Sequence, residues 1–475
     1  MKTIKRVLWA LLIVFVSWPL GYSMTKTNSL IILDYRSGID YTESAIALVS
    51  KHCGEIYHVF RGKVLMGYIP EDKVSFLIGN RGILNIYQNQ TEPDKPDPLV
   101  NSAIKAFNDL LQPREELTEE EIQEKRVEPL KNDVRITYPT KGSKTGLSDR
   151  FTSEYMIGRV AVGIVIVEGN GDTLYDWTEN QLDWATAAII EELDWLANIA
   201  SESNSNVCWF YDWHYSVPVP EEPIAGPSGI DCVDEDRVIS WIGYAIQALG
   251  YNPGSRVWDP FCGWWVFPDG VSAIYNYVHN IRCANKTDWA FAIFVANGHT
   301  FADGASAWAL QWSDEEGRFH GGPYLVLTRM FMYVDAAHET FHMFGAADEY
   351  HRENSDCENI FSCDDKFGYL QIENRNCVHC PGSIPCKMKS PWTYAACGYT
   401  RFQAGWRDND GDGPADPIDP NSGRFITIYW VQPSDRIKIF TLGEDPEFVK
   451  FIAVTPDNSC TWGGTNAIMW DGTNA

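Results

Sequence analysis

The residues best suited to chemistry lie at positions 338–342, where the chain carries the motif His-Glu-Thr-Phe-His. Residues four positions apart share one face of an α-helix, so the imidazoles of His338 and His342 can reach a single Zn²⁺ ion. Glu339 can hold the water at the open coordination site and take its proton as the water attacks a carbonyl. The alternative, two core histidines with this spacing, gives the complete motif by chance on the order of one time in a hundred. The motif therefore predicts a zinc-dependent hydrolytic centre with Glu339 as general base.

The residues that follow the second histidine supply a third zinc ligand. Gly345 lies three positions after His342, where the helix must end, and glycine adopts the left-handed conformation that such a turn needs. Asp348 follows after three more residues, and a carboxylate oxygen is an ordinary zinc ligand. Glu349 is the rival for this role, and the spacing after the glycine turn favours Asp348. We therefore expect His338, His342 and Asp348 to bind zinc, with Glu349 as the open alternative.

The whole string, His-Glu-x-x-His-x-x-Gly-x-x-Asp, resembles the extended motif of the metzincin metallopeptidases, with aspartate in place of the final histidine. That resemblance implies a methionine turn beneath the metal site. Met388, within Cys386-Lys387-Met388-Lys389, is the candidate for its apolar floor. The alternative for Met388 is a methionine that only fills the core.

Three segments narrow the resemblance to secreted bacterial metallopeptidases related to the IgA-peptidase-like group. The segments are 152–158, 345–350 and 399–406, and the similarity covers roughly residues 150–425. It implies peptide-bond hydrolysis but names no substrate. Three tyrosines are candidates to polarise a substrate carbonyl, each with a structural role as the alternative: Tyr350, Tyr394 and Tyr399.

A second candidate metal site lies at residues 408–419. Aspartates occupy positions 1, 3, 5, 9 and 12 of a calcium-type loop, and Gly413 occupies position 6. These aspartates are Asp408, Asp410, Asp412, Asp416 and Asp419. Clustered carboxylates repel one another unless a cation neutralises them. Pro414 at position 7 and aspartate at position 12 bring the loop closer to dockerin or thrombospondin-type loops than to an EF-hand. We expect structural Ca²⁺, with a solvated acidic turn as the alternative.

Apolar runs and helical patterns predict the scaffold that positions these residues. Residues 160–167 are continuously apolar and rich in β-branched side chains, which is typical of a buried strand. Thr178 and Gln181 form a capping-box pattern before a long amphipathic helix. Further strands are expected at 207–211, 289–296 and 324–327, and a further helix at 236–249. Strands that alternate with helices indicate an α/β sandwich.

Residues 28–90 have the pattern of a separate small domain. Strand and helix patterns follow one another there in the order β-α-β-β-α-β, which is that of a ferredoxin-like fold. The expected elements are 29–33, 41–50, 55–60, 63–68, 71–78 and 83–87. The stretch 64–71, with the helix and strand after it, resembles the propeptide inhibitors of subtilisin-like proteases. That resemblance implies an intramolecular propeptide and a zymogen; the alternative is an ordinary α+β domain.

The two ends of the chain and the linker have patterns of their own. Residues 1–23 have the features of a signal peptide, with Lys2, Lys5 and Arg6 before an apolar stretch that is short for a membrane span. Residues 91–150 are expected to be a linker with charged helices. Residues 424–475 are expected to be a β-rich tail. Its Trp470-Asp471-Gly472 stretch resembles part of an Ig-like domain, which suggests a truncated domain or a fragment.

Charge and cysteine content bound the function. The formal net charge of −26 and the lack of a basic patch argue against a nucleic-acid partner. Twelve cysteines in an exported chain favour disulfides, and six of them lie between Cys357 and Cys397, in a cysteine-rich insertion at 351–400. The alternative there is a second metal site at residues 377–380. Cys53 is expected to be unpaired.

These patterns together predict a secreted zinc endopeptidase, located outside the cell, in the periplasm or at the cell surface. The expected fold is an α/β (α+β) metzincin-like catalytic domain at 151–423, with a mixed sheet and an active-site helix. A ferredoxin-like domain precedes it and the β-rich tail follows it. The expected partner is a protein or peptide substrate, and no membrane span is expected. The alternative functions are a surface binding or adhesion protein that retains a zinc site, and a zinc amidase that acts on cell-wall peptides or glycoproteins.

Overall fold

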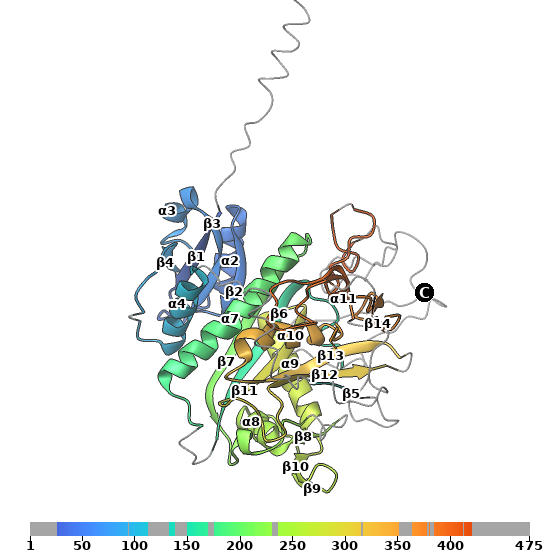
Figure 1. The fold of residues 1–475 in the computed structure, drawn as a ribbon. Coiled ribbons are helices and arrows are strands. Elements are labelled where there is room, and N and C mark those ends of the chain that lie inside the picture. The colour runs from blue at the N-terminus through green and yellow to red at the C-terminus, as the bar shows by residue number, and fades with distance from the viewer. Residues whose placement is uncertain are drawn as a thin grey trace, which may run out of the picture.

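A computed structural model of the chain (Figure 1) describes residues 26–93, 95–112, 133–137, 150–169, 175–229, 236–314, 317–350, 363–377, 380, 384–411 and 413–419. Four predictions therefore lie wholly or largely outside the described residues. They are the signal peptide at 1–23, the stretches 113–132 and 138–149 of the linker predicted at 91–150, the tail at 424–475 and Asp412 of the acidic loop.

One ten-stranded sheet runs through the molecule in the order β4-β1-β3-β2-β7-β6-β11-β13-β12-β5. Its central strands are parallel to one another: β7 (Val207–Pro218), β6 (Gly158–Glu168), β11 (Trp289–Ala296) and β13 (Phe319–Thr328). β12 (Ala307–Ser313) is antiparallel to β13, and β5 (Asp133–Thr137) is parallel to β12. The prediction of a mixed α/β architecture with a mixed sheet is thus confirmed.

Helices cover both faces of this sheet, which explains why its central strands are apolar throughout. On β6, Val160 and Val162 belong to one core cluster, whereas Ala161 and Val165 belong to the other. The first face carries α4 (Pro98–Leu110), α7 (Glu179–Glu202) and α10 (Met332–Met343). The second face carries α8 (Ser240–Ala248) and α9 (Gly270–Asn285). No helix among the described residues is both long and apolar enough to span a membrane.

Helix α7 begins as its sequence predicts. The hydroxyl of Thr178 accepts a hydrogen bond from the backbone N–H of Gln181, and the Gln181 side chain accepts one from the N–H of Thr178, which completes the capping box. The helix predicted at 236–249 is shorter than expected. Within the predicted range, Val238–Ile239 form β8, which pairs with β10 (Trp264–Phe267) in a small sheet that also contains β9 (Val257–Asp259), and α8 begins only at Ser240.

The N-terminal unit has the predicted order of strands and helices. Its elements are β1 (Lys26–Leu33), α2 (Thr42–Lys51), β2 (Glu55–Phe60), β3 (Val64–Pro70), α3 (Val74–Leu77) and β4 (Ile83–Tyr87). The helix expected at 71–78 is divided, because a 3₁₀ turn (Glu71–Lys73) precedes α3. Apolar residues of α2 and α3 share one cluster on a single face of this part of the sheet.

The N-terminal unit shares its sheet with the rest of the chain. β2 pairs with β7 in parallel, with His58, Val59 and Phe60 opposite Trp209, Phe210 and Tyr211. On the other face from α2, the long helix α7 contacts both β2 and β7, and Figure 1 shows it running beside the N-terminal unit. Apolar residues of β1, β2 and β3 lie in the same core cluster as those of α7 and α10. The small unit is therefore an extension of one large sheet.

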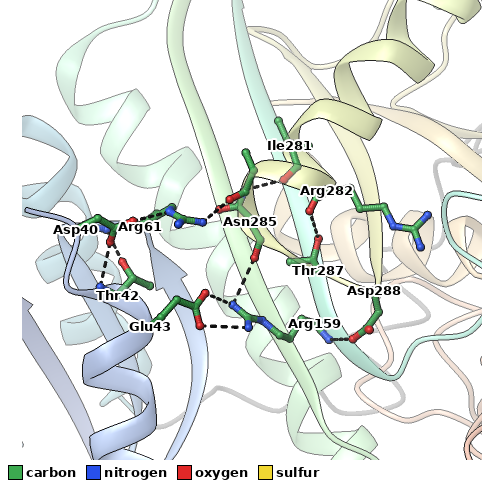
Figure 2. A network of polar contacts seen from close by, with 12 residues as sticks. Asp40, Thr42, Glu43, Arg61, Arg159, Ile281, Arg282, Asn285, Thr287 and Asp288 are labelled. Carbon is green, nitrogen blue, oxygen red and sulfur yellow. Dashed lines mark hydrogen bonds and ion pairs between the residues drawn. The ribbon is translucent and has the colours of Figure 1, made fainter. Parts of the chain in front are cut away.

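Polar contacts also join the N-terminal unit to the larger part (Figure 2). Arg159 on β6 forms an ion pair with Glu43 on α2, with 2.5 Å between Nη2 and Oε1. Arg61, which follows β2, donates through Nε to Asp40 at 2.7 Å and through Nη1 to the carbonyl of Ala284 at 2.5 Å. These contacts link the tip of the N-terminal unit to β6 and to the end of α9.

We expect apolar contacts to hold the N-terminal unit in place more strongly than this polar network. Glu43→Gln should lower the free energy of unfolding by at most about 1 kcal/mol, because the side chains of the pair are 32% and 41% exposed. Phe60→Ala should lower it by about 3–5 kcal/mol, since this ring is buried in the core cluster. Urea unfolding followed by circular dichroism measures both values, and equal losses would contradict the expectation.

Candidate metal centre

Helix α10 carries the predicted motif and packs against β12, β13 and α7. It ends at Met343, and Gly345 follows with a φ of 79°, in the left-handed region. A Cβ at this position would also lie 3.0 Å from the Cα of Gly368. Glycine is therefore required twice, for its backbone conformation and for the close approach of a neighbouring segment. The predicted helix end is confirmed.

The turn after α10 brings Asp348 back to the two histidines. Asp348 Oδ1 lies 3.1 Å from His338 Nε2 and 3.2 Å from His342 Nε2. The two Nε2 atoms lie 3.2 Å from each other. Ligand atoms at zinc-bond lengths in a tetrahedral site are separated by about 3.3 Å. The three atoms therefore form a triangle of the size that one face of a zinc site needs.

The hydrogen bonds of the histidines orient both rings toward this triangle. His338 Nδ1 donates to the carbonyl oxygen of Lys387 at 3.1 Å, and His342 Nδ1 donates to that of Ala346 at 2.8 Å. A carbonyl can only accept, so each ring carries a proton on Nδ1. Each Nε2 then offers a lone pair to the centre of the triangle, which is the arrangement of metal-ligating histidines held by outer partners. A cation fits between these lone pairs and the carboxylate.

Burial and charge act in opposite directions on Asp348. Burial raises the pKa of this carboxyl, but the two facing histidines in their protonated form donate to it and lower the pKa, so that the net pKa lies well below its usual range. Glu339 lies on the same helix turn and is 1% exposed, and Tyr350 packs with its ring centroid 6.2 Å from that of His338. Tyr394 instead donates to the carbonyl of Tyr333, and Tyr399 is exposed.

Glu349 turns away from the histidines into a second buried cluster. Its Oε1 accepts hydrogen bonds from Cys397 Sγ and Thr400 Oγ1, both at 2.9 Å, and its Oε2 accepts one from Asn376 at 2.6 Å. Burial, together with a hydrogen bond to Cys397, raises the pKa of the nearby Cys386 thiol. Glu349, Cys386 and Cys397 also form a group of metal-ligand type. Of the two rivals for third ligand, the structure brings Asp348, not Glu349, to the histidines.

Met388 lies in a turn that contacts both α10 and the loop after it. Residues 387–389 form a tight turn in which the N–H groups of Lys389 and Ser390 both donate to the carbonyl of Cys386. The Met388 side chain is fully buried in the core cluster that contains Ala337 and Phe341 of α10. Its backbone carbonyl accepts a hydrogen bond from the N–H of Glu349 at 2.9 Å. The turn thus connects the helix to the loop that carries Asp348.

The segments that carry the family resemblance meet around this centre. α11 (Gly398–Gln403) contacts the loop that carries Asp348, because Gln403 Oε1 accepts a hydrogen bond from the N–H of Ala347 at 3.1 Å. Trp406 Nε1 donates to the carbonyl of Met156 at 2.6 Å.

Comparisons with protein-family models, with curated proteins and with solved structures give no significant match.

The acidic loop is described except for Asp412. Asp408 accepts backbone hydrogen bonds from Gly411 at 2.7 Å and from Gly413 at 3.0 Å. Asp416 forms an ion pair with Arg407, with 2.5 Å between Nε and Oδ2. The chain itself therefore supplies a cation to this cluster, and Asp410 is exposed whereas Asp419 is buried. Calcium binding by this loop stays a prediction.

The cysteines favour disulfides over a second site at 377–380. Cys363 and Cys380 are joined by a disulfide, and Cys262 and Cys283 each take part in a disulfide as well. Cys380 is thereby unavailable as a thiolate ligand. Cys53 has a free, exposed thiol, as expected.

Two supporting residues were missed by sequence reasoning. Gln311 on β12 is fully buried, and its Nε2 donates to the carbonyls of His342 at 3.0 Å and Ala346 at 2.9 Å. Lys387 supplies the carbonyl that orients His338. Neither has a local sequence signal, because each acts on a residue more than thirty positions away and β12 itself was not predicted.

Proposed function

We propose that this chain is a secreted zinc-dependent endopeptidase with a metzincin-like catalytic domain. The observation that carries the proposal is the convergence of His338 Nε2, His342 Nε2 and Asp348 Oδ1 to within 3.2 Å of one another beside Glu339. A bound zinc ion would lower the pKa of a water molecule and polarise a substrate carbonyl.

The residues around that site have two roles, metal binding and proton transfer. His338, His342 and Asp348 would hold the ion, and three protein ligands are the number that catalytic zinc sites use. Glu339 takes a proton on its carboxylate and passes it to the leaving amine. The buried environment of Glu339 strengthens each of these electrostatic interactions by excluding water. The disulfide between Cys363 and Cys380 supports an oxidising, extracytoplasmic location.

The N-terminal unit is proposed to be a ferredoxin-like domain that supports the catalytic domain. Its element order and its strand order β4-β1-β3-β2 support the first part. The pairing of β2 with β7 favours a lasting role in building the sheet over release as an inhibitory propeptide. The acidic loop at 408–419 is proposed to bind structural Ca²⁺ through its clustered carboxylates.

One observation favours a second candidate function, a surface binding protein with a structural zinc site. The side chains of His338, Glu339 and His342 are 0–1% exposed, and that of Asp348 is 6% exposed. A structural site has no use for a buried glutamate beside its ligands, which is why we prefer the enzyme. A zinc amidase would share the same site and differ only in substrate.

Metal removal should separate these functions. A strong chelator is expected to abolish peptide cleavage, and stoichiometric Zn²⁺ should restore it. In the proposed mechanism the nucleophile is a water molecule activated by the metal, so the chain alone, with its ligands but without zinc, has no nucleophile. Incubation with a proteome-derived peptide mixture, followed by mass spectrometry of the new termini, measures cleavage and specificity together. Elemental analysis gives the metal content. Bound zinc without any cleaved peptide would favour the binding protein, and cleavage that survives complete metal removal would overturn the proposal.

A further inference from the structure

A buried ion pair lies beside the candidate metal centre and has no part in the proposed chemistry. Lys387 Nζ lies 2.9 Å from Glu192 Oε2, and the two side chains are 0% and 1% exposed. Glu192 comes from the middle of α7, and Lys387 from the turn that also carries Met388. The pair thus joins α7, the longest helix among the described residues, to the turn that contacts His338.

The surroundings of the ammonium group are aromatic. Nζ lies 5.3 Å from the ring centroid of Trp195 and 4.3 Å from that of Tyr394. Both rings stabilise a cation by their π faces, and Trp195 stands on the same helix as Glu192. Removing two charges from water is costly, and an apolar pair of similar volume is often as stable as a buried ion pair. Stability alone therefore does not account for this arrangement.

The backbone of the same turn contacts both segments that carry the candidate ligands, helix α10 and the loop with Asp348. The carbonyl of Lys387 accepts from His338 Nδ1 at 3.1 Å. The carbonyl of the next residue, Met388, accepts from the N–H of Glu349 at 2.9 Å, directly after Asp348. A shift of this turn would move the acceptor that fixes the tautomer and ring angle of His338. It would also break the hydrogen bond between the Met388 carbonyl and the N–H of Glu349, which holds the loop that carries Asp348.

We infer that the Glu192–Lys387 ion pair is a positioning device for the metal centre, and this inference rests on the zinc site of the proposed function. The charged side chains fix the turn against α7, and the carbonyl of Lys387 then holds the His338 ring with its Nε2 lone pair toward the metal. Lys387 and Glu192 are positioning residues, because the pair acts on His338 through the backbone carbonyl of Lys387.

The experiment compares zinc affinity with stability of the metal-free protein. The double variant Glu192→Gln/Lys387→Met removes both charges and leaves no buried charge unpaired. It should bind zinc about 10–100-fold more weakly than the wild type in a competition assay with a chromophoric chelator, as other outer-sphere changes do. The metal-free double variant should still unfold cooperatively. At saturating zinc, kcat should fall while KM for a peptide stays unchanged.

The control uses a different ion pair on α7. Lys105 of α4 pairs with Asp183 of α7, away from the turn at Lys387. Lys105→Met/Asp183→Asn should leave zinc affinity unchanged, so that a general effect of loosening α7 can be recognised. Wild-type zinc affinity in the Glu192→Gln/Lys387→Met protein, or an equal loss in the control, would overturn the inference.

A milder variant covers the case in which the double variant does not fold. Glu192→Asp keeps both charges and only shortens the carboxylate side chain by one methylene group, which draws it back from Lys387. It should weaken zinc binding severalfold; wild-type affinity would overturn the inference. The zinc assay is independent of catalysis. A wild-type protein that binds zinc but cleaves no peptide would defeat the proposed hydrolysis and leave the positioning test intact, whereas a wild-type protein that binds no zinc would overturn both.

Discussion

Glu339→Ala is expected to lower kcat by about 10²–10⁴-fold, the usual contribution of a general base, while zinc stays bound. The reason is geometric. The three atoms that converge belong to His338, His342 and Asp348, so removal of the Glu339 carboxylate leaves the metal-binding atoms in place. Without its carboxylate, the attacking water must give its proton to solvent. The variant should therefore keep its metal and lose its chemistry.

The measurement pairs turnover of one fluorogenic peptide with elemental analysis of the same sample. Thr340→Ser is a suitable control, because Thr340 is the next residue of the buried helix and its hydroxyl donates to the carbonyl of Ala336 at 2.6 Å, a bond that serine can keep. It should retain near-normal activity. Full turnover by Glu339→Ala would contradict the mechanism, and loss of zinc from that variant would assign Glu339 to the ligand set instead.

The core of the metal centre could be predicted because it is local. The interval from His338 to Asp348 is 11 residues, and helix geometry plus one left-handed glycine suffices to close it. The buried strands were equally visible, since continuous apolar runs such as 289–296 have few other solutions in a soluble domain. Local patterns therefore predict the elements and the ligands that lie within a single helix and turn.

The supports of the centre could not be predicted because they come from distant positions. Lys387 acts on His338 across 49 residues, and Gln311 reaches Ala346 from a strand whose sequence has no clean alternation. A lone lysine or glutamine in a sequence is most often a surface residue, and only the fold shows these two to be buried. The pairing of β2 with β7 is hidden in the same way. Each strand has its own apolar pattern, but neither pattern shows which other strand it pairs with in the sheet.

The choice between Asp348 and Glu349 shows how spacing and environment combine. The sequence places both carboxylates at the end of the same turn, and glycine spacing favours the first. In the structure, Asp348 faces two histidines, whereas Glu349 faces hydrogen-bond donors from Cys397, Thr400 and Asn376. Adjacent side chains in an extended segment point to opposite sides. When the Asp348 carboxylate faces the histidines, the Glu349 carboxylate therefore points away from them and binds hydrogen-bond donors in the core.

Asp348→Ala and Glu349→Gln should therefore have opposite effects. Asp348→Ala removes a ligand, so zinc affinity should fall by at least about 100-fold, more than an outer-sphere change would cause. Each tenfold loss of affinity removes about 1.4 kcal/mol of the stabilisation that excess zinc gives to the folded state. Thermal unfolding of Asp348→Ala should thus respond weakly to added zinc, while its metal-free form unfolds close to the wild type.

Glu349→Gln should show the reverse pattern. The carboxylate of Glu349 accepts hydrogen bonds at both oxygens, whereas the amide of glutamine can accept at one side only. One buried hydrogen bond is therefore lost, and the free energy of unfolding should fall by about 1–3 kcal/mol with or without zinc. Zinc affinity should stay near that of the wild type, because the three atoms of the triangle are untouched. Chelator competition and thermal unfolding of both variants measure the two quantities separately. Should Glu349→Gln lose zinc while Asp348→Ala keeps it, the ligand set would be His338, His342 and Glu349, and the loop after Gly345 would have to turn differently when the metal binds.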